Sequence, residues 1–182
     1  LQNRNSSIEE EKQQIIAMLD KLNVQEKFLE SSNQQLSEEN KVLTEKLNKA
    51  SAFLASEVKL SPVAVKNDRE QETSTAKKTS KLIISFAVQN NIADYNSTEV
   101  FVVITQPDGK LLTNDVWESA STIDTKEEGK KRYTRKIKFE YQKGERKNLT
   151  FSINADEYQK GTYTLQLYHN GYMIGQTVKA LG

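Results

Sequence analysis

Few side chains in this 182-residue chain are of the types that carry out catalysis or bind metals. His169 is the sole histidine and there is no cysteine, so zinc sites and thiol nucleophiles lack their usual residues. Catalysis by a Ser–His–Asp triad would need a serine and an aspartate close to His169, and no local pattern indicates them. The acidic pairs at 127–128 and 156–157 lack the alternating oxygen ligands of a calcium loop. We therefore expect no enzymatic activity, no metal and no cofactor.

A second set of side chains is suited to binding rather than to catalysis. Lys136 and Lys138 fall on the outer face of a predicted strand, where they either contact an anionic ligand or keep the strand soluble. Trp117, in a predicted loop, either stacks on a ligand or packs into the end of the domain. The candidate ligand surface consists of Trp117, Lys136, Lys138, Tyr158 and Tyr172. The formal net charge is only +1, so we expect no nucleic acid partner.

Residues 1–56 contain no Gly or Pro and are rich in Glu, Lys, Gln and Leu, a composition typical of a long helix. Apolar residues recur in it at an unbroken seven-residue spacing. This repeat predicts the seam of a coiled coil. Its members are Ile8, Ile15, Leu22, Leu29, Leu36, Leu43 and Ala50.

The heptad phase decides what the seam contains. If the seven-residue repeat is position d of the heptad, Asn33 and Asn40 occupy position a, as in a parallel two-stranded coil. If the repeat is position a instead, position d holds fewer apolar residues. We favour a parallel homodimer, with other coiled-coil states and an unpaired helix as alternatives. Lys12 and Glu26 at position a predict a weak coil. The expected interface comprises Ile8, Ile15, Leu19, Leu22, Leu29, Asn33, Leu36, Asn40, Leu43, Leu47 and Leu54.

Residues 57–182 change to the period-two pattern of β-strands. The stretch 135–141 alternates apolar and charged residues, and Asn170-Gly171 between two such runs predicts a type I′ hairpin. Residues 58–66 have the character of an edge strand, although the pattern does not establish that they belong to the sheet. Residues 67–80 hold no large apolar residue and predict a flexible loop. The fold class is thus a long helix followed by an all-β antiparallel immunoglobulin-like sandwich.

The end of the chain resembles known domains. Lys160-Gly161-Thr162-Tyr163-Thr164-Leu165, followed by Leu167 to Gly175, is similar to the last two strands of bacterial immunoglobulin-like and fibronectin-type-III-like domains, and Gly161-Thr162-Tyr163 resembles a tyrosine corner. The order of coil, Leu-Ser-Pro-Val-like strand, Lys/Thr-rich loop and sandwich resembles uncharacterised, membrane-anchored bacterial envelope proteins. That resemblance implies a cell-envelope location and no catalytic residues. Because the sequence starts at Leu1 within polar, helix-compatible sequence, we expect the anchor to precede it.

These patterns predict a dimeric stalk that presents an interaction domain, a cell-envelope scaffold or adaptor binding an unidentified protein. The alternative is a carbohydrate-binding module that the coil makes bivalent.

Overall fold

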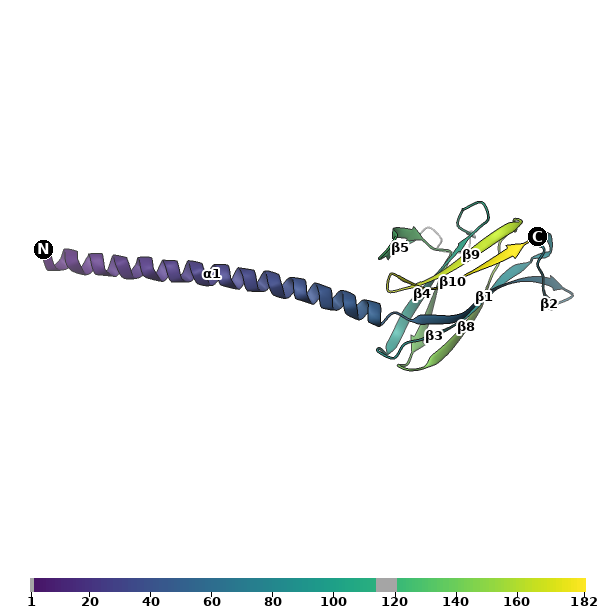
Figure 1. Ribbon diagram of the computed structural model, residues 1–182, viewed down its shortest axis with the longest axis horizontal. Helices are drawn as coiled ribbons and strands as arrows, with labels where there is room; N and C mark the ends of the chain where they lie inside the picture. Colours follow the sequence, from purple (N-terminus) through teal and green to yellow (C-terminus); the bar gives the residue numbers. More distant parts are fainter. Residues whose placement is uncertain (1, 114–120) are drawn as a thin grey trace. The chain divides into compact units, whose positions relative to one another are not determined.

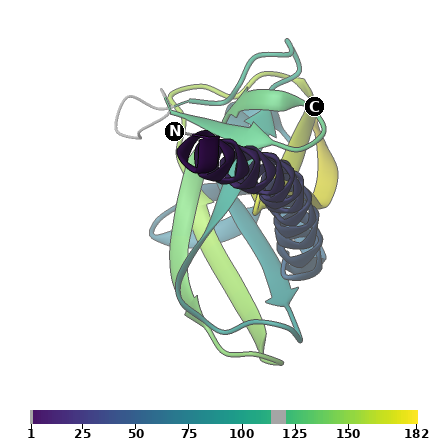
Figure 2. The same ribbon diagram turned by 90° about the vertical axis from the view of Figure 1, so that its left-hand side faces the viewer.

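The computed structural model describes residues 2–113 and 121–182, which form one long helix followed by antiparallel sheets (Figure 1). The chain divides into two compact units, residues 1–47 and 48–182. Helix α1 spans Gln2–Ala50, 49 residues without a helix breaker. It curves gently, as Figure 2 shows by looking along it. Lys49 lies in its last turn, where a positive charge interacts favourably with the negative end of the helix dipole.

The helix ends before the predicted boundary. The sequence places residues 1–56 in the helix, but α1 stops at Ala50, and β1 spans Leu54–Lys66. Phe53 is buried and packs on Tyr95, Phe139 and Tyr141 of the β domain, so it belongs to the core of that domain. Leu54 is therefore not part of the seam, and its inclusion there was wrong. Burial of Phe53 is a tertiary effect that a heptad count cannot detect.

Two four-stranded antiparallel sheets pack on one hydrophobic core (Figures 1 and 2). The first sheet has the strand order β2-β1-β3-β8, where β2 spans Arg69–Glu72, β3 spans Lys81–Gln89 and β8 spans Arg146–Ile153. The second sheet has the strand order β10-β9-β4-β7, where β10 spans Tyr172–Leu181, β9 spans Gly161–His169, β4 spans Tyr95–Thr105 and β7 spans Arg135–Tyr141. Inward-facing residues of the two sheets alternate with outward-facing ones and include Leu82, Ile84, Val100, Val102, Leu165 and Leu167.

Residues 58–66 do form part of a sheet, but not at its edge throughout. β1 pairs with β3 along most of its length and with β2 from Val63 to Lys66. The stretch 67–80, expected to be a flexible loop, instead contains β2 and a 3₁₀ turn at Ala76–Lys78. Asn67 and Asp68 both have positive φ angles, which permits the tight turn between β1 and β2. All four residues of β2 are exposed, so its strand pairing leaves no apolar pattern in the sequence.

A short hairpin lies on the outer face of the second sheet. β5 (Thr122–Thr125) pairs with β6 (Gly129–Arg132). Beneath it, Val103, Ile123, Tyr133 and Tyr168 form a second, smaller hydrophobic cluster. The hairpin is held in place because the Lys131 amino group contacts the Tyr168 hydroxyl at 3.1 Å.

Two local predictions at the C-terminal end are confirmed. Asn170 and Gly171 have φ angles of 52° and 81°, as a type I′ turn requires. The Tyr163 hydroxyl donates to the carbonyl of Gln159 at 3.1 Å and accepts from its backbone N–H at 2.7 Å. This bonding to the backbone four residues upstream is that of a tyrosine corner.

Candidate functional site

The predicted seam residues of α1 form an exposed apolar column. They keep between 54% and 62% of their surface accessible, and the residues concerned are Ile8, Ile15, Leu19, Leu22, Leu29, Leu36, Leu43 and Leu47. Such a column on a polar helix is the feature that a partner helix would cover.

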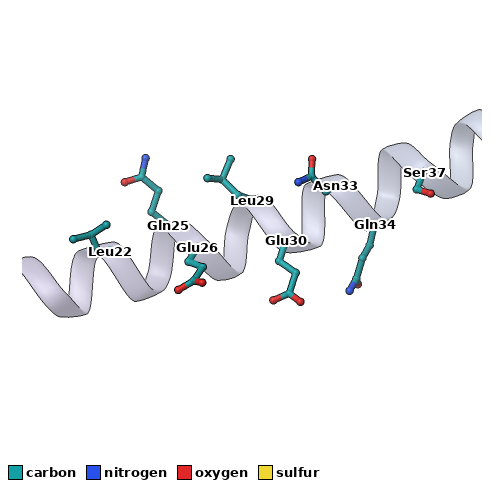
Figure 3. A pocket seen from close by; sticks show the side chains of 8 residues that line it. All are labelled: Leu22, Gln25, Glu26, Leu29, Glu30, Asn33, Gln34 and Ser37. Carbon is teal, nitrogen blue, oxygen red and sulfur yellow. The ribbon is translucent and has the colours of Figure 1, made fainter.

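Polar side chains lie beside the seam leucines along the middle of α1. Figure 3 shows them together with Leu22 and Leu29, lining one depression on the helix: Gln25, Glu26, Glu30, Asn33, Gln34 and Ser37. Asn33 and Asn40 are exposed, so their amides are available to a partner.

The β domain carries a cleft of about 660 Å³ between β4, β5 and the turn that joins β9 to β10. Its lining combines rings, hydroxyls, carboxylates and an amide: Tyr95, Ser97, Thr98, Glu99, Phe101, Thr122, Ile123, Asp124, Asn170 and Gly171. None of these residues was predicted as part of a ligand site, because β4 and β5 are separated by a long stretch of sequence. The volume falls within the range of about 300–1,000 Å³ that is usual for ligand sites.

The Asn170-Gly171 turn shapes one wall of the cleft. The Lys126 N–H donates to the carbonyl of Gly171 at 2.9 Å. A side chain at position 171 would lie 2.9 Å from the Asp124 carbonyl oxygen, so only glycine permits this approach. The hairpin and the turn are therefore held together at one end of the cleft.

Lys136 and Lys138 are brought together on the outer face of β7, next to the cleft. Both amino groups lie near Glu99, at 3.7 Å and 3.1 Å from its Oε1. Glu99 is opposite Lys138 in the pairing of β4 with β7. Part of the positive charge that the sequence suggested for anion binding is thus balanced by this carboxylate.

The other predicted ligand residues do not join this group. Tyr158 is half-buried, and its hydroxyl donates to the carbonyl of Ile153 and accepts from the N–H of Ala155, so it has a structural role. Tyr172 lines a different, smaller depression with Phe53 and Met173. Trp117 lies outside the described residues.

His169, which offered the only imidazole, is a buried structural residue. It is 1% exposed, and its Nδ1 accepts from the N–H of Phe53 at 3.3 Å. With Nδ1 an acceptor, a neutral ring carries its proton on Nε2, which lies 2.8 Å from the Thr98 hydroxyl. Burial lowers the pKa of His169 from 6.5 to about 4. No group of three or more His, Asp or Glu in the described residues is arranged to hold a metal.

The burial of His169 makes stability depend on pH. Its pKa is 6.5 when unfolded and about 4 when folded, so the unfolded chain binds the extra proton first as the pH falls. We expect this residue's contribution to be complete above pH 6.5 and to be lost progressively down to about pH 4, a decrease on the order of 3 kcal/mol.

Urea unfolding across this pH range, with His169→Gln as the non-titrating comparison, measures that decrease. Carboxylates titrate in both proteins, so the difference between the two pH profiles isolates the imidazole. Parallel profiles would contradict a depressed pKa for His169.

The fold defines a class of protein with a long N-terminal helix and an antiparallel β domain. The chain belongs to the DUF8428 family, a domain of unknown function, whose family model matches residues 56–181. No curated protein matches the chain by sequence. Among the helices in the described residues, none is long and apolar enough to span a membrane.

Solved structures with a similar arrangement are distant. β-Glucosidase 3B from Thermotoga neapolitana in complex with glucose is 12% identical with a TM-score of 0.44, over 72% of this chain and 16% of that chain. The GH3 β-glucosidase of Bifidobacterium adolescentis is 15% identical with a TM-score of 0.39, over 71% and 17%. The DNA glycosylase AlkC of Pseudomonas fluorescens is 9% identical with a TM-score of 0.42, over 71% and 30%. The matched region is a minor part of each of these proteins, and the scores carry no argument about function.

Proposed function

We propose that this chain is a non-enzymatic stalk protein. In this proposal α1 pairs in parallel with α1 of a second copy, and the rod presents two β domains for binding to a partner. The observation that carries the proposal is the exposed apolar column of α1. Burying a leucine side chain stabilises by about 1.5–3 kcal/mol. The free energy gained by burying a column of this length is therefore large enough to offset the roughly 4–15 kcal/mol that association costs.

The two seam asparagines support a parallel arrangement. In a parallel, in-register pair, each of Asn33 and Asn40 meets its own counterpart, and the two amides can bond to each other. In an antiparallel pair, position a faces position d, so each amide faces leucine. A buried amide without a partner costs about 1–3 kcal/mol.

The length of the helix suits a spacer. Its 49 residues extend roughly 70 Å at about 1.5 Å per residue. The order of strands in the two sheets and the Tyr163 corner support an immunoglobulin-like sandwich as the binding part. We further propose a scaffold or adaptor role in the cell envelope, which rests on the sequence resemblance to envelope proteins.

Distance measurement between spin labels tests the parallel pairing. The chain has no cysteine, so Glu45→Cys introduces a single label site, on the side of α1 away from the predicted seam. In a parallel coil, with helix axes about 8–10 Å apart, we expect the two labels to lie within about 30 Å. In an antiparallel coil they would be separated by roughly 55 Å, from a rise of about 1.5 Å per residue.

Dilution with unlabelled protein is the control, because each chain carries one label and dilution therefore removes the distance between two labelled chains. A distance near the larger value would overturn the parallel stalk, and no measurable distance between chains would overturn the dimer itself.

A further inference from the structure

We propose that the cleft between β4, β5 and the Asn170-Gly171 turn binds an uncharged oligosaccharide. This assignment deepens the proposed function by naming the ligand class of the β domain, and it rests on that domain being the binding part of the stalk. It does not require the dimer.

The cleft offers aromatic rings whose positions are held by the fold. The Tyr95 hydroxyl donates to the carbonyl of Ser51 at 2.9 Å, and its ring meets His169 edge-on with centroids 5.5 Å apart. Phe101 lies against Tyr133, with centroids 5.0 Å apart. Both Tyr95 and Phe101 are half-buried yet line the cleft. Rings that are already ordered lose little entropy when a flat, weakly apolar sugar face packs on them.

Around these rings stand groups that match sugar hydroxyls. Asp124 is exposed and provides a carboxylate that accepts hydrogen bonds. The Asn170 amide nitrogen lies 3.5 Å from the Tyr95 hydroxyl, and the amide oxygen is a further acceptor. Ser97 and Thr122 add hydroxyls at the rim. A dense set of donors and acceptors beside aromatic surface, with little aliphatic surface, fits a polyhydroxylated ligand better than an apolar one.

Two other ligand classes fit less well. An anionic ligand would meet the carboxylates of Glu99 and Asp124, and Lys136 and Lys138 on the neighbouring strand are already close to Glu99. An extended peptide would bind by pairing with the free edge of β5. That edge is obstructed at Asp124, where Gly171 packs against its carbonyl group.

Saturation-transfer NMR with the full chain tests the proposal. The probes are cellotetraose, maltotetraose and fully N-acetylated chitotetraose at millimolar concentration, with tetragalacturonate as the anionic comparison. We expect at least one uncharged tetrasaccharide to bind and tetragalacturonate not to bind. Asp124→Ala removes an acceptor of charge-assisted hydrogen bonds, so the affinity should fall about tenfold or more.

Asp156→Ala is the matched control, since Asp156 is also exposed but does not line the cleft. It should leave binding unchanged. Failure of all three uncharged probes, equal loss in the Asp156 and Asp124 variants, or preferential binding of tetragalacturonate would each overturn the proposal. Light scattering on the same sample reports the oligomeric state, so a monomer that binds sugar would refute the stalk dimer and leave the glycan cleft intact.

Discussion

The double substitution Leu22→Lys and Leu29→Lys is expected to convert the proposed dimer into a monomer. Both leucines lie in the exposed apolar column and point to the same side of α1. In a paired coil they would be enclosed by the partner helix, where an unpaired ammonium group is strongly disfavoured. In a parallel dimer the substitution also sets identical positive charges opposite each other. Multi-angle light scattering should give twice the 20.7 kDa chain mass for the unaltered protein and a single chain mass for the variant.

A pair of equally apolar but differently placed residues provides the control. Val24 and Phe28 are 69% and 72% exposed, yet they lie outside the predicted seam. The double substitution Val24→Lys and Phe28→Lys adds the same charge to the same helix and should leave the dimer intact. A dimer that survives the Leu22/Leu29 change but not the Val24/Phe28 change would place the interface on the other side of α1.

Replacing Phe53 by alanine is expected to destabilise the β domain by about 3–5 kcal/mol, the usual cost of removing a buried phenylalanine ring. Phe53 is 3% exposed, and its ring lies within 4.3–5.6 Å, between centroids, of four other rings: Tyr95, Phe139, Tyr141 and His169. Chemical denaturation followed by tyrosine fluorescence or circular dichroism measures the effect.

Leu54, the residue after Phe53, offers a direct comparison. Its side chain on β1 is 71% exposed, so Leu54→Ala should change the free energy of unfolding by less than about 0.5 kcal/mol. Similar losses for the two variants would show that residues 53 and 54 are not distinguished by burial, and would contradict the placement of Phe53 in the core.

Short-range patterns in the sequence were sufficient for the local elements. The absence of Gly and Pro in the first fifty residues predicts α1, because helix formation depends on the intrinsic propensities of consecutive residues. Alternation along 135–141 predicts β7, and Asn170-Gly171 predicts its hairpin because few residues tolerate two consecutive positive φ angles. The seven-residue column indicates which face of α1 is apolar, whereas pairing with a second chain stays a prediction.

The tertiary structure decided which residues meet. β2 is a strand because it pairs with β1, not because its Arg-Glu-Gln-Glu sequence favours one, so it was predicted as a loop. Phe53 was assigned to the coil, since its burial depends on residues up to 116 positions away, including His169.

The cleft shows the same division most clearly. Lys136 and Lys138 could be placed on one face from their spacing, but their proximity to Glu99 follows from the pairing of β4 with β7. Asp124 and Asn170 are brought to one cleft by the close approach of Gly171 to the β5–β6 hairpin, a contact between segments far apart in the sequence. The sequence by itself determined the helix, the strands adjacent to clear turns and the faces they expose. Only the fold determined the core around Phe53 and the ligand cleft, because both depend on long-range contacts that no local period encodes.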